Sequence, residues 1–201
     1  MRNSHDARDR RGLLARLFWL QDSGSQIVEF ALSVPLLVLF VVGIFDFSGA
    51  LALKHKLTNA AREAARVAAA DPATDLAEFS TPVPVSVSDA VQVVDNYLIS
   101  EKVNDCGLNS LGPTWIHSAP NLFWTAKATT CLSPSTTGLQ IKVDRGCISQ
   151  QSMSGTPVDL VGTCVTIQYP YVWQFTSVAG LFSSFTGPAN IITTANAFNE
   201  N

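Results

Sequence analysis

The sequence predicts an α+β fold in which one long amino-terminal helix packs against a small antiparallel β-sheet. Residues 24–70 have the pattern of a single helix that is apolar at first and amphipathic later. Beyond residue 138, short segments alternate between apolar and polar residues, which is typical of strands with one buried face. The composition, 47% hydrophobic and 14% charged residues, suits a membrane-anchored protein with an exterior domain of low charge.

Residues 1–24 form a basic leader that we expect on the cytoplasmic side of a membrane. The leader holds five Arg against three Asp, and basic residues favour the cytoplasmic end of a span. Its leucines are consistent with a short amphipathic helix on the inner leaflet. Basic residues also follow the span, at Lys54, Lys56, Arg62 and Arg66, so charge alone leaves the orientation open.

The segment from Ile27 to Phe45 is long and apolar enough to cross a bilayer. Its 19 residues, at about 1.5 Å each, extend over about 28 Å, which is close to the thickness of the hydrocarbon core. Glu29 is its only charge before Asp46, and a carboxylate at mid-membrane costs about 2.5–3.5 kcal/mol, so it calls for a partner. The alternative is an interfacial glutamate that reaches water at little cost. Pro35 removes one backbone hydrogen bond from the predicted helix.

Both ends of this helix carry further patterns. Gly24 and Ser25 stand at the mouth of the span, and Glu29 and Phe30 follow, with Glu29 at the fifth position after the glycine. At the other end, in NAAREAARVAA, pairs of alanines recur every four residues and place small side chains on one helical face, which allows close approach of a helix or sheet. With VEFAL, Pro35 and IFDF between these ends, residues 24–67 resemble the TadE-like family of the tight adherence (Flp) pilus system.

The resemblance implies a pilin-like fold with a structural role, as a pseudopilin or minor pilin. In pilin-like proteins a prepilin peptidase cuts after the glycine, which places the cut between Gly24 and Ser25. The fifth-position acid, here Glu29, then offsets a subunit's new amino terminus during packing. The resemblance also implies assembly in the bacterial inner membrane with the pilus platform and other pilin-like subunits, with the amino terminus cytoplasmic and the carboxy-terminal domain periplasmic or extracellular.

Beyond the helix, which Asp71-Pro72 is expected to end, the sequence predicts a linker and an exported domain. Residues 71–87 are rich in proline and are interpreted as the linker, and residues 88–201 as the ectodomain. Ser88 is a candidate cap for a second helix that ends before Gly107 and places Val91, Val94 and Leu98 on one face. Residues 107–138 contain many turn signals and predict no clear element.

Three strands are expected, over residues 139–144, 165–173 and 190–198. Pro170 indicates that the second of them is an edge strand or carries a bulge. Its aromatic residues, Tyr169, Tyr171 and Trp173, fit core packing better than an adhesive ridge. We expect the apolar face of this sheet to pack against the alanine side of the long helix.

Four cysteines, all beyond the span, indicate an oxidising compartment and two disulfides. Of the three possible pairings, Cys147 with Cys164 joins two predicted strands, which leaves Cys106 with Cys131. Strict alternation would place Cys147 and Cys164 on opposite faces, so this pairing requires Gly146 to break the pattern. Zinc binding is disfavoured because the sequence has no C-x-x-C pair.

The remaining features argue against catalysis and nucleic-acid binding. Residues 71–201 hold four Lys or Arg against ten Asp or Glu, a net charge of −6, where nucleic acid requires a basic face. No catalytic motif is present, and His117, interpreted as a loop residue, has no recognisable partner. We therefore expect no enzymatic activity, no cofactor and no metal site. The alternative function is a membrane-anchored binding or sensing ectodomain that does not polymerise.

Overall fold

The structure is a computed structural model that describes residues 6–76, 83–117, 122–131, 138–153, 156–173 and 190–199. The chain divides into two compact units, Met1–Phe47 and Ser48–Asn201. The boundary falls inside the first helix, α1, which runs from Asp6 to Ala70 and contains Pro35. The helix is therefore longer than predicted, because described residues of the leader belong to it and Gly24 is not its start. Its predicted end before Asp71-Pro72 is correct.

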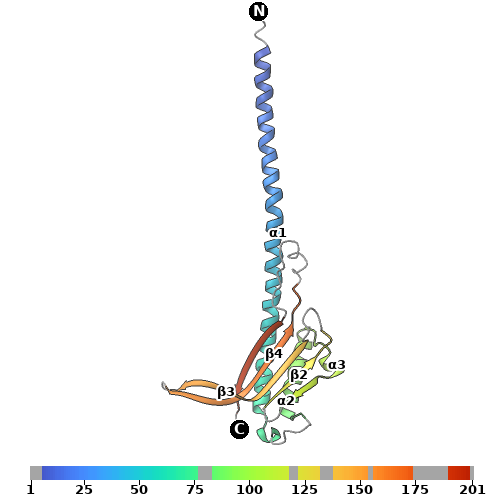
Figure 1. Cartoon of the computed structure of the whole chain (residues 1–201), viewed down its shortest axis with the longest axis vertical. Helices are drawn as coiled ribbons and strands as arrows, with labels where there is room; N and C mark the ends of the chain where they lie inside the picture. Colours follow the sequence, from blue (N-terminus) through green and yellow to red (C-terminus); the bar gives the residue numbers. More distant parts are fainter. Residues whose placement is uncertain are drawn as a thin grey trace, which may run out of the picture. The chain divides into compact units, whose positions relative to one another are not determined.

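Five strands form one antiparallel sheet in which each strand pairs with the next along the chain (Figure 1). The strands are β1 (Thr114–His117), β2 (Phe123–Ala128), β3 (Leu139–Met153), β4 (Thr156–Pro170) and β5 (Asn190–Phe198). β2 pairs with β3 only over Leu139–Asp144, and β5 pairs with β4 only over Gly162–Pro170. The remainder of the β3–β4 hairpin extends beyond the neighbouring strands as a two-stranded ribbon (Figure 1).

The three predicted strands are present, and the sheet contains two more. β5 has the predicted bounds, whereas β3 and β4 are each longer than the alternation suggested. The predicted end of β4 at residue 173 is wrong, because the strand ends at Pro170. The expectation that Pro170 marks an edge strand or a bulge is wrong, because β4 lies between β3 and β5 and Pro170 is simply its last residue. β1 and β2 lie in the turn-rich region for which the sequence predicted no element. His117 therefore belongs to a strand, not to a loop.

The core of the second unit forms where one face of the sheet meets small residues of α1. The alanines at positions 60, 61, 64, 65 and 68 are fully buried, in one cluster with Ile141, Val143, Val165 and Ile167 of the central strands. Thr58 of α1 also shares a hydrogen bond of 2.9 Å with Thr193 of β5. Alanine side chains allow the helix backbone to lie close to the sheet, as the sequence predicted.

The predicted linker contains a short helix, and the second helix begins earlier than expected. A short 3₁₀ helix, η1, spans Ala73–Leu76, and α2 spans Val85–Ser100. Ser88 does not cap α2, because Pro84 precedes the helix and the Ser88 hydroxyl donates to the Val85 carbonyl inside it. Proline is favourable at a helix start, since it has no N–H to leave unpaired. The helix ends at Ser100, before Gly107, which precedes the short helix α3 (Leu108–Leu111).

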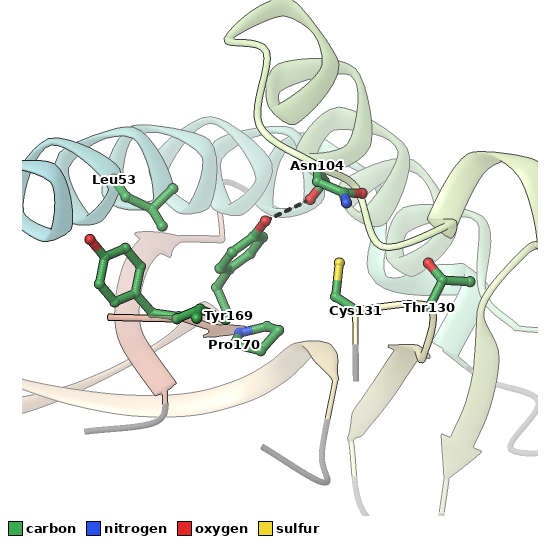
Figure 2. A pocket seen from close by; sticks show the side chains of 8 residues that line it. Leu53, Asn104, Thr130, Cys131, Tyr169 and Pro170 are labelled. Carbon is green, nitrogen blue, oxygen red and sulfur yellow. Dashed lines mark hydrogen bonds between the residues drawn. The ribbon is translucent and has the colours of Figure 1, made fainter. Parts of the chain in front are cut away.

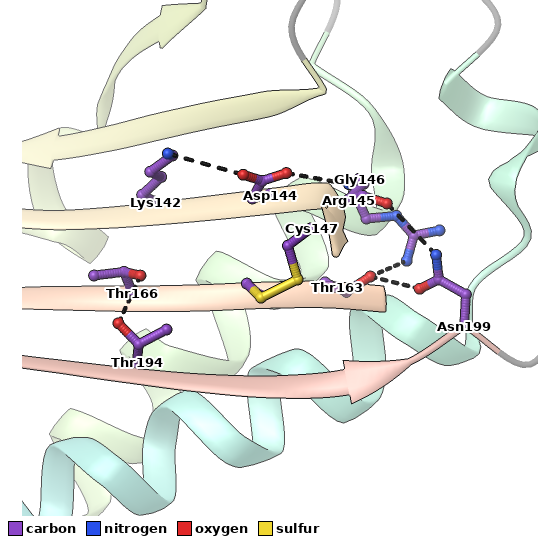
Figure 3. The surroundings of a disulfide bond; sticks show 10 residues. Lys142, Asp144, Arg145, Gly146, Cys147, Thr163, Thr166, Thr194 and Asn199 are labelled. Carbon is purple, nitrogen blue, oxygen red and sulfur yellow. Dashed lines mark hydrogen bonds and ion pairs between the residues drawn. A yellow bond between two sulfur atoms is a disulfide. The ribbon is translucent and has the colours of Figure 1, made fainter. Parts of the chain in front are cut away.

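The structure contains two disulfides, Cys106–Cys131 and Cys147–Cys164, the pairs that the sequence suggested. Figure 3 shows the second of them between β3 and β4. The expected break in alternation occurs here, because the β3–β4 register shifts between Asp144 and Cys147. A β-bulge of this kind rotates the following side chain. Cys147 thus reaches Cys164.

A buried arginine, Arg145, lies beside this bulge (Figure 3). Hydrogen bonds connect it to the residue after α1, to β4 and to the residue after β5. Arg145 is 2% exposed, and its guanidinium donates to the Asp71 carbonyl at 2.9 Å and to Thr163 Oγ1 at 3.2 Å. Thr163 in turn donates to Asn199 Oδ1 at 2.7 Å, beyond the end of β5. Burial lowers the pKa of Arg145, while the charges of Asp75 and Asp71 oppose this shift. The guanidinium therefore supplies positive charge to two acidic residues at the end of α1.

Candidate functional site: the apolar half of α1

Residues 24–47, in the amino-terminal unit, form an apolar helical segment whose side chains are mostly exposed. Within the described residues, one helical segment, Gly24–Ala70, is long and apolar enough to cross a membrane, with a mean hydropathy of 2.6 in its most apolar window. None of that window is buried, whereas the core helix of a soluble protein would be mostly buried. Large apolar side chains, such as those of Ile27, Leu32 and Phe45, are exposed around the helix. Such a surface requires an apolar environment, either lipid or other apolar helices.

The four residues predicted to act in processing and assembly lie within two turns of α1. Gly24 and Ser25 are exposed, and a Cβ at Gly24 would meet nothing within 4 Å, so packing does not explain this glycine. Glu29 is exposed, and its carboxylate forms no ion pair within the part of the chain that the structure describes. Phe30, beside it, is 71% exposed. Of these groups, only the Glu29 backbone carbonyl is engaged by a side chain, since it accepts a hydrogen bond of 2.8 Å from the Ser33 hydroxyl.

This arrangement leaves one carboxylate on an otherwise apolar helical surface. An ionised carboxylate in hydrocarbon is stable only with a hydrogen-bond donor or a positive charge beside it. The described chain offers Glu29 no such partner. Chemically, the site can therefore accept a cationic group from another molecule, such as an amino terminus.

Comparison with known protein families finds a match for this part of α1. The family described as TadE-like protein matches residues 24–66. Residues 24–66 are therefore similar to the TadE-like family. The resemblance inferred from the sequence is thereby confirmed, and it indicates involvement in the tight adherence (Flp) pilus system. Comparisons with curated proteins and with solved structures found no match.

The TadE-like segment consists of two halves with opposite surfaces. Up to Phe47 most of its apolar side chains are exposed, while in the half that belongs to the second unit the alanines are buried in the ectodomain core. Arg62 and Arg66 are exposed on the polar side of this second half, where Arg66 forms an exposed ion pair with Glu63. Such exposed pairs contribute little to stability. The alanine face is thus occupied within the chain, and the exposed apolar half is what remains for contacts with lipid or other subunits.

The aromatic residues at the end of β4 belong largely to the ectodomain core, as predicted. Tyr169 is buried and donates from its hydroxyl to the Asn104 carbonyl at 3.0 Å, between α1 and the loop after α2 (Figure 2). Burial raises the pKa of Tyr169, and the negative charge of Asp105 adds to this shift. Tyr171 and Trp173 are half-buried, with their rings edge to face at 5.0 Å. The cavity in Figure 2, about 400 Å³, is lined by Leu53, Thr130 and Cys131 among others, and its described lining holds no charged side chain.

The remaining predicted chemistry concerns His117 and metal ligands. His117 stacks on Trp124 with ring centroids 4.6 Å apart, and its Nδ1 is 2.9 Å from the Phe123 carbonyl. These contacts position the ring within the sheet. No group of three or more His, Cys, Asp or Glu side chains that could hold a metal ion occurs in the described residues.

The sequence did not reveal two buried charged residues of the ectodomain, Arg145 and Asp95. Arg145 follows Leu139, Ile141 and Val143 at the same alternating positions, so the period of the strand places it on the core face. Asp95 follows Val91 by one helical turn, on the apolar face of α2. In each case the signal is a charge that continues an apolar stripe.

Proposed function

We propose that this chain is a pilin-like structural component, a pseudopilin or minor pilin, of tight adherence (Flp) pilus assembly and secretion. Its role is non-catalytic. It is anchored by a single span in the bacterial inner membrane, with the amino terminus cytoplasmic and the ectodomain periplasmic or extracellular. Its partners are a prepilin peptidase, the inner-membrane assembly platform and other pilin-like subunits.

One observation carries this proposal. The TadE-like match begins at Gly24, and Glu29 stands as a lone carboxylate on the exposed apolar helix that follows. A helix that served only as an anchor would gain nothing from a charge that costs about 2.5–3.5 kcal/mol at mid-membrane. A subunit that packs against the free amino terminus of a neighbour recovers that cost, because the two charges then neutralise each other.

The two disulfides support the proposed orientation. Both are in the ectodomain, and disulfides persist in oxidising compartments such as the bacterial periplasm. This favours an exported position for residues after the span. It supports one of the two orientations that the basic residues at both ends of the apolar segment leave open.

Glu29→Ala tests the assembly role. The variant is expected to reach the membrane at least as efficiently as the wild type, because a buried charge has been removed, but to lose crosslinks to neighbouring subunits and to abolish piliation. The crosslinks are measured with a photoreactive phenylalanine at position 30, where the side chain is exposed. Glu29→Gln separates loss of charge from loss of size, and Ser33→Ala, one turn further along the same helix, is the matched control.

Two outcomes decide between this function and the alternative. If Glu29→Ala supports normal piliation and crosslinking, the glutamate is an interfacial residue and the assembly role is wrong. If neither wild type nor variant crosslinks to any pilin-like subunit, the chain is a membrane-anchored binding ectodomain that does not polymerise.

A further inference from the structure

A cavity of about 290 Å³ lies on the ectodomain between α2 and the α3–β1 segment. Three elements line it: α2 with Val91, Gln92 and Asp95, α3 with Leu108, and β1 with Trp115; Ser88, Asp89, Asn109 and Pro113 complete the lining. Its volume is at the lower end of the range for ligand sites, about 300–1,000 Å³. The cavity therefore suits one side chain better than a large cofactor.

A carboxylate without a counter-ion forms part of this cavity. Asp95 is 8% exposed, and its Oδ1 is buried with no hydrogen-bond partner in the described structure. Asp95 also lies near a second acidic residue, Asp105. The Asp105 carboxylate accepts hydrogen bonds from the backbone N–H groups of Gly107 at 3.3 Å and Asn109 at 3.0 Å. Asp105 is itself acidic and therefore supplies no positive charge to Asp95. Burial raises the pKa of Asp95, and the negative charge of Asp105 and a side-chain hydrogen bond with Asp105 add to the shift.

The cavity lining carries negative charge and offers no cation. Its described residues include Asp89 and Asp95 but no Lys or Arg. α3 contains no charged residue. The one basic side chain of β1 is His117, and its ring stacks on Trp124 and contacts the Phe123 carbonyl. The rest of the described lining contains no basic side chain. A buried carboxylate in such surroundings costs stability unless a positive group reaches it.

We propose that this pocket binds a basic side chain of a partner protein, with Asp95 as its counter-ion. A guanidinium or ammonium group would supply the donor that Asp95 Oδ1 lacks. The aliphatic part of the same side chain would lie against Val91 and Leu108, which are buried, and the indole of Trp115 offers a face that attracts cations. A metal ion is not the expected occupant, because the described acidic residues form no group able to hold one.

This site is separate from the TadE-like segment, and the proposal does not depend on the pilus role. The lining residues lie between positions 88 and 115, whereas the family match ends at residue 66. Either a polymerising subunit or a non-polymerising binding ectodomain could use it.

Titration of the full chain in detergent micelles with Nα-acetylarginine methylamide tests the site. Tryptophans labelled with fluorine report binding by NMR, and the Trp115 signal is assigned by its loss in Trp115→Phe. The arginine probe is expected to shift the Trp115 signal, while the same derivative of citrulline, which has equal shape and no charge, is not. Asp95→Asn should weaken binding by about thirtyfold or more, as for other buried charge pairs that lose one partner. Asp159→Asn, on the exposed part of β4, is the control and should bind like the wild type.

A second variant keeps the test independent of any folding defect in Asp95→Asn. Gln92 lines the cavity and is exposed, three residues before Asp95 on α2, so Gln92→Arg can place a guanidinium in the pocket from within the chain. This variant should unfold at a higher temperature than the wild type and no longer respond to the probe. Equal shifts with the citrulline derivative, unchanged binding in Asp95→Asn, or unchanged binding in Gln92→Arg would each overturn the proposal.

Discussion

The stability of the ectodomain should depend strongly on one buried arginine. Arg145 is 2% exposed and donates to the carbonyl at the end of α1 and to Thr163 of β4. Arg145→Met keeps most of the volume but removes the charge and both hydrogen bonds. Asp71 and Asp75 each have a buried carboxylate oxygen without a hydrogen-bond partner within the described structure, and they would then also lose the positive charge beside them.

The expected loss of unfolding free energy in Arg145→Met follows from the interactions that the guanidinium makes. Hydrogen bonds made by a charged group contribute about 1.5–3 kcal/mol each, and Arg145 donates two, against a total unfolding free energy of about 5–15 kcal/mol for a domain. We therefore expect Arg145→Met to lose a third or more of the ectodomain's stability. Arg145→Lys retains the charge without the planar fork that reaches two acceptors, so its loss should be smaller.

The assay is urea unfolding of the full chain in detergent micelles, followed by tryptophan fluorescence. Trp124 is 4% exposed within the core cluster and reports loss of the sheet. Arg62→Met is the control, since Arg62 is exposed on α1 and methionine has a similar helix propensity. A loss below about 1 kcal/mol, or one equal to that of the control, would refute the claim that Arg145 compensates buried negative charge.

Two further predictions concern the same domain. Replacing both Cys147 and Cys164 by serine should lower the unfolding free energy by about 3 kcal/mol and the melting temperature by about 6–12 °C. The reason is that the disulfide closes a loop with a sequence separation of 17. If thiol labelling of the unreduced, denatured wild type finds four reactive thiols, the pairing and the exported orientation are contradicted. Because the folded-state pKa of Asp95 lies above 3.8, its contribution to stability is full below that pH and is lost as pH rises through the folded-state pKa. Asp95→Asn should therefore gain stability over the wild type between about pH 4 and neutrality in urea unfolding. A difference in stability between the two proteins that stays constant with pH would contradict the raised pKa.

Much of this fold could be predicted because its main elements have strong local patterns. The apolar run of α1, the alanine repeat and the alternation in β5 each express one period over many residues. The two strands that were missed, β1 and β2, are four and six residues long and lie among prolines and glycines, so their period is hardly expressed. Their place in the sheet is set by pairing with β3, which is a tertiary contact that local patterns do not contain.

The functional residues likewise fall into those that the sequence pattern revealed and those that only the structure revealed. Gly24 and Glu29 could be singled out because their spacing matches a family pattern, whereas Asp95 and Arg145 have no motif. Their importance arises from burial, which depends on how α2, α3 and the strands pack. The bulge beside Cys147 is a further case, because the sequence required a break near Gly146 but only the strand register shows where it falls.

The amino terminus of the mature protein tests the central claim most directly. Chain recovered from bacterial membranes is analysed by intact mass, alongside a Gly24→Arg variant. We expect the wild type to begin at Ser25 and the variant to accumulate as a longer precursor, because the peptidase of pilin-like proteins requires the glycine. Functional wild-type protein that retains residues 1–24 would contradict processing as a pilin-like subunit.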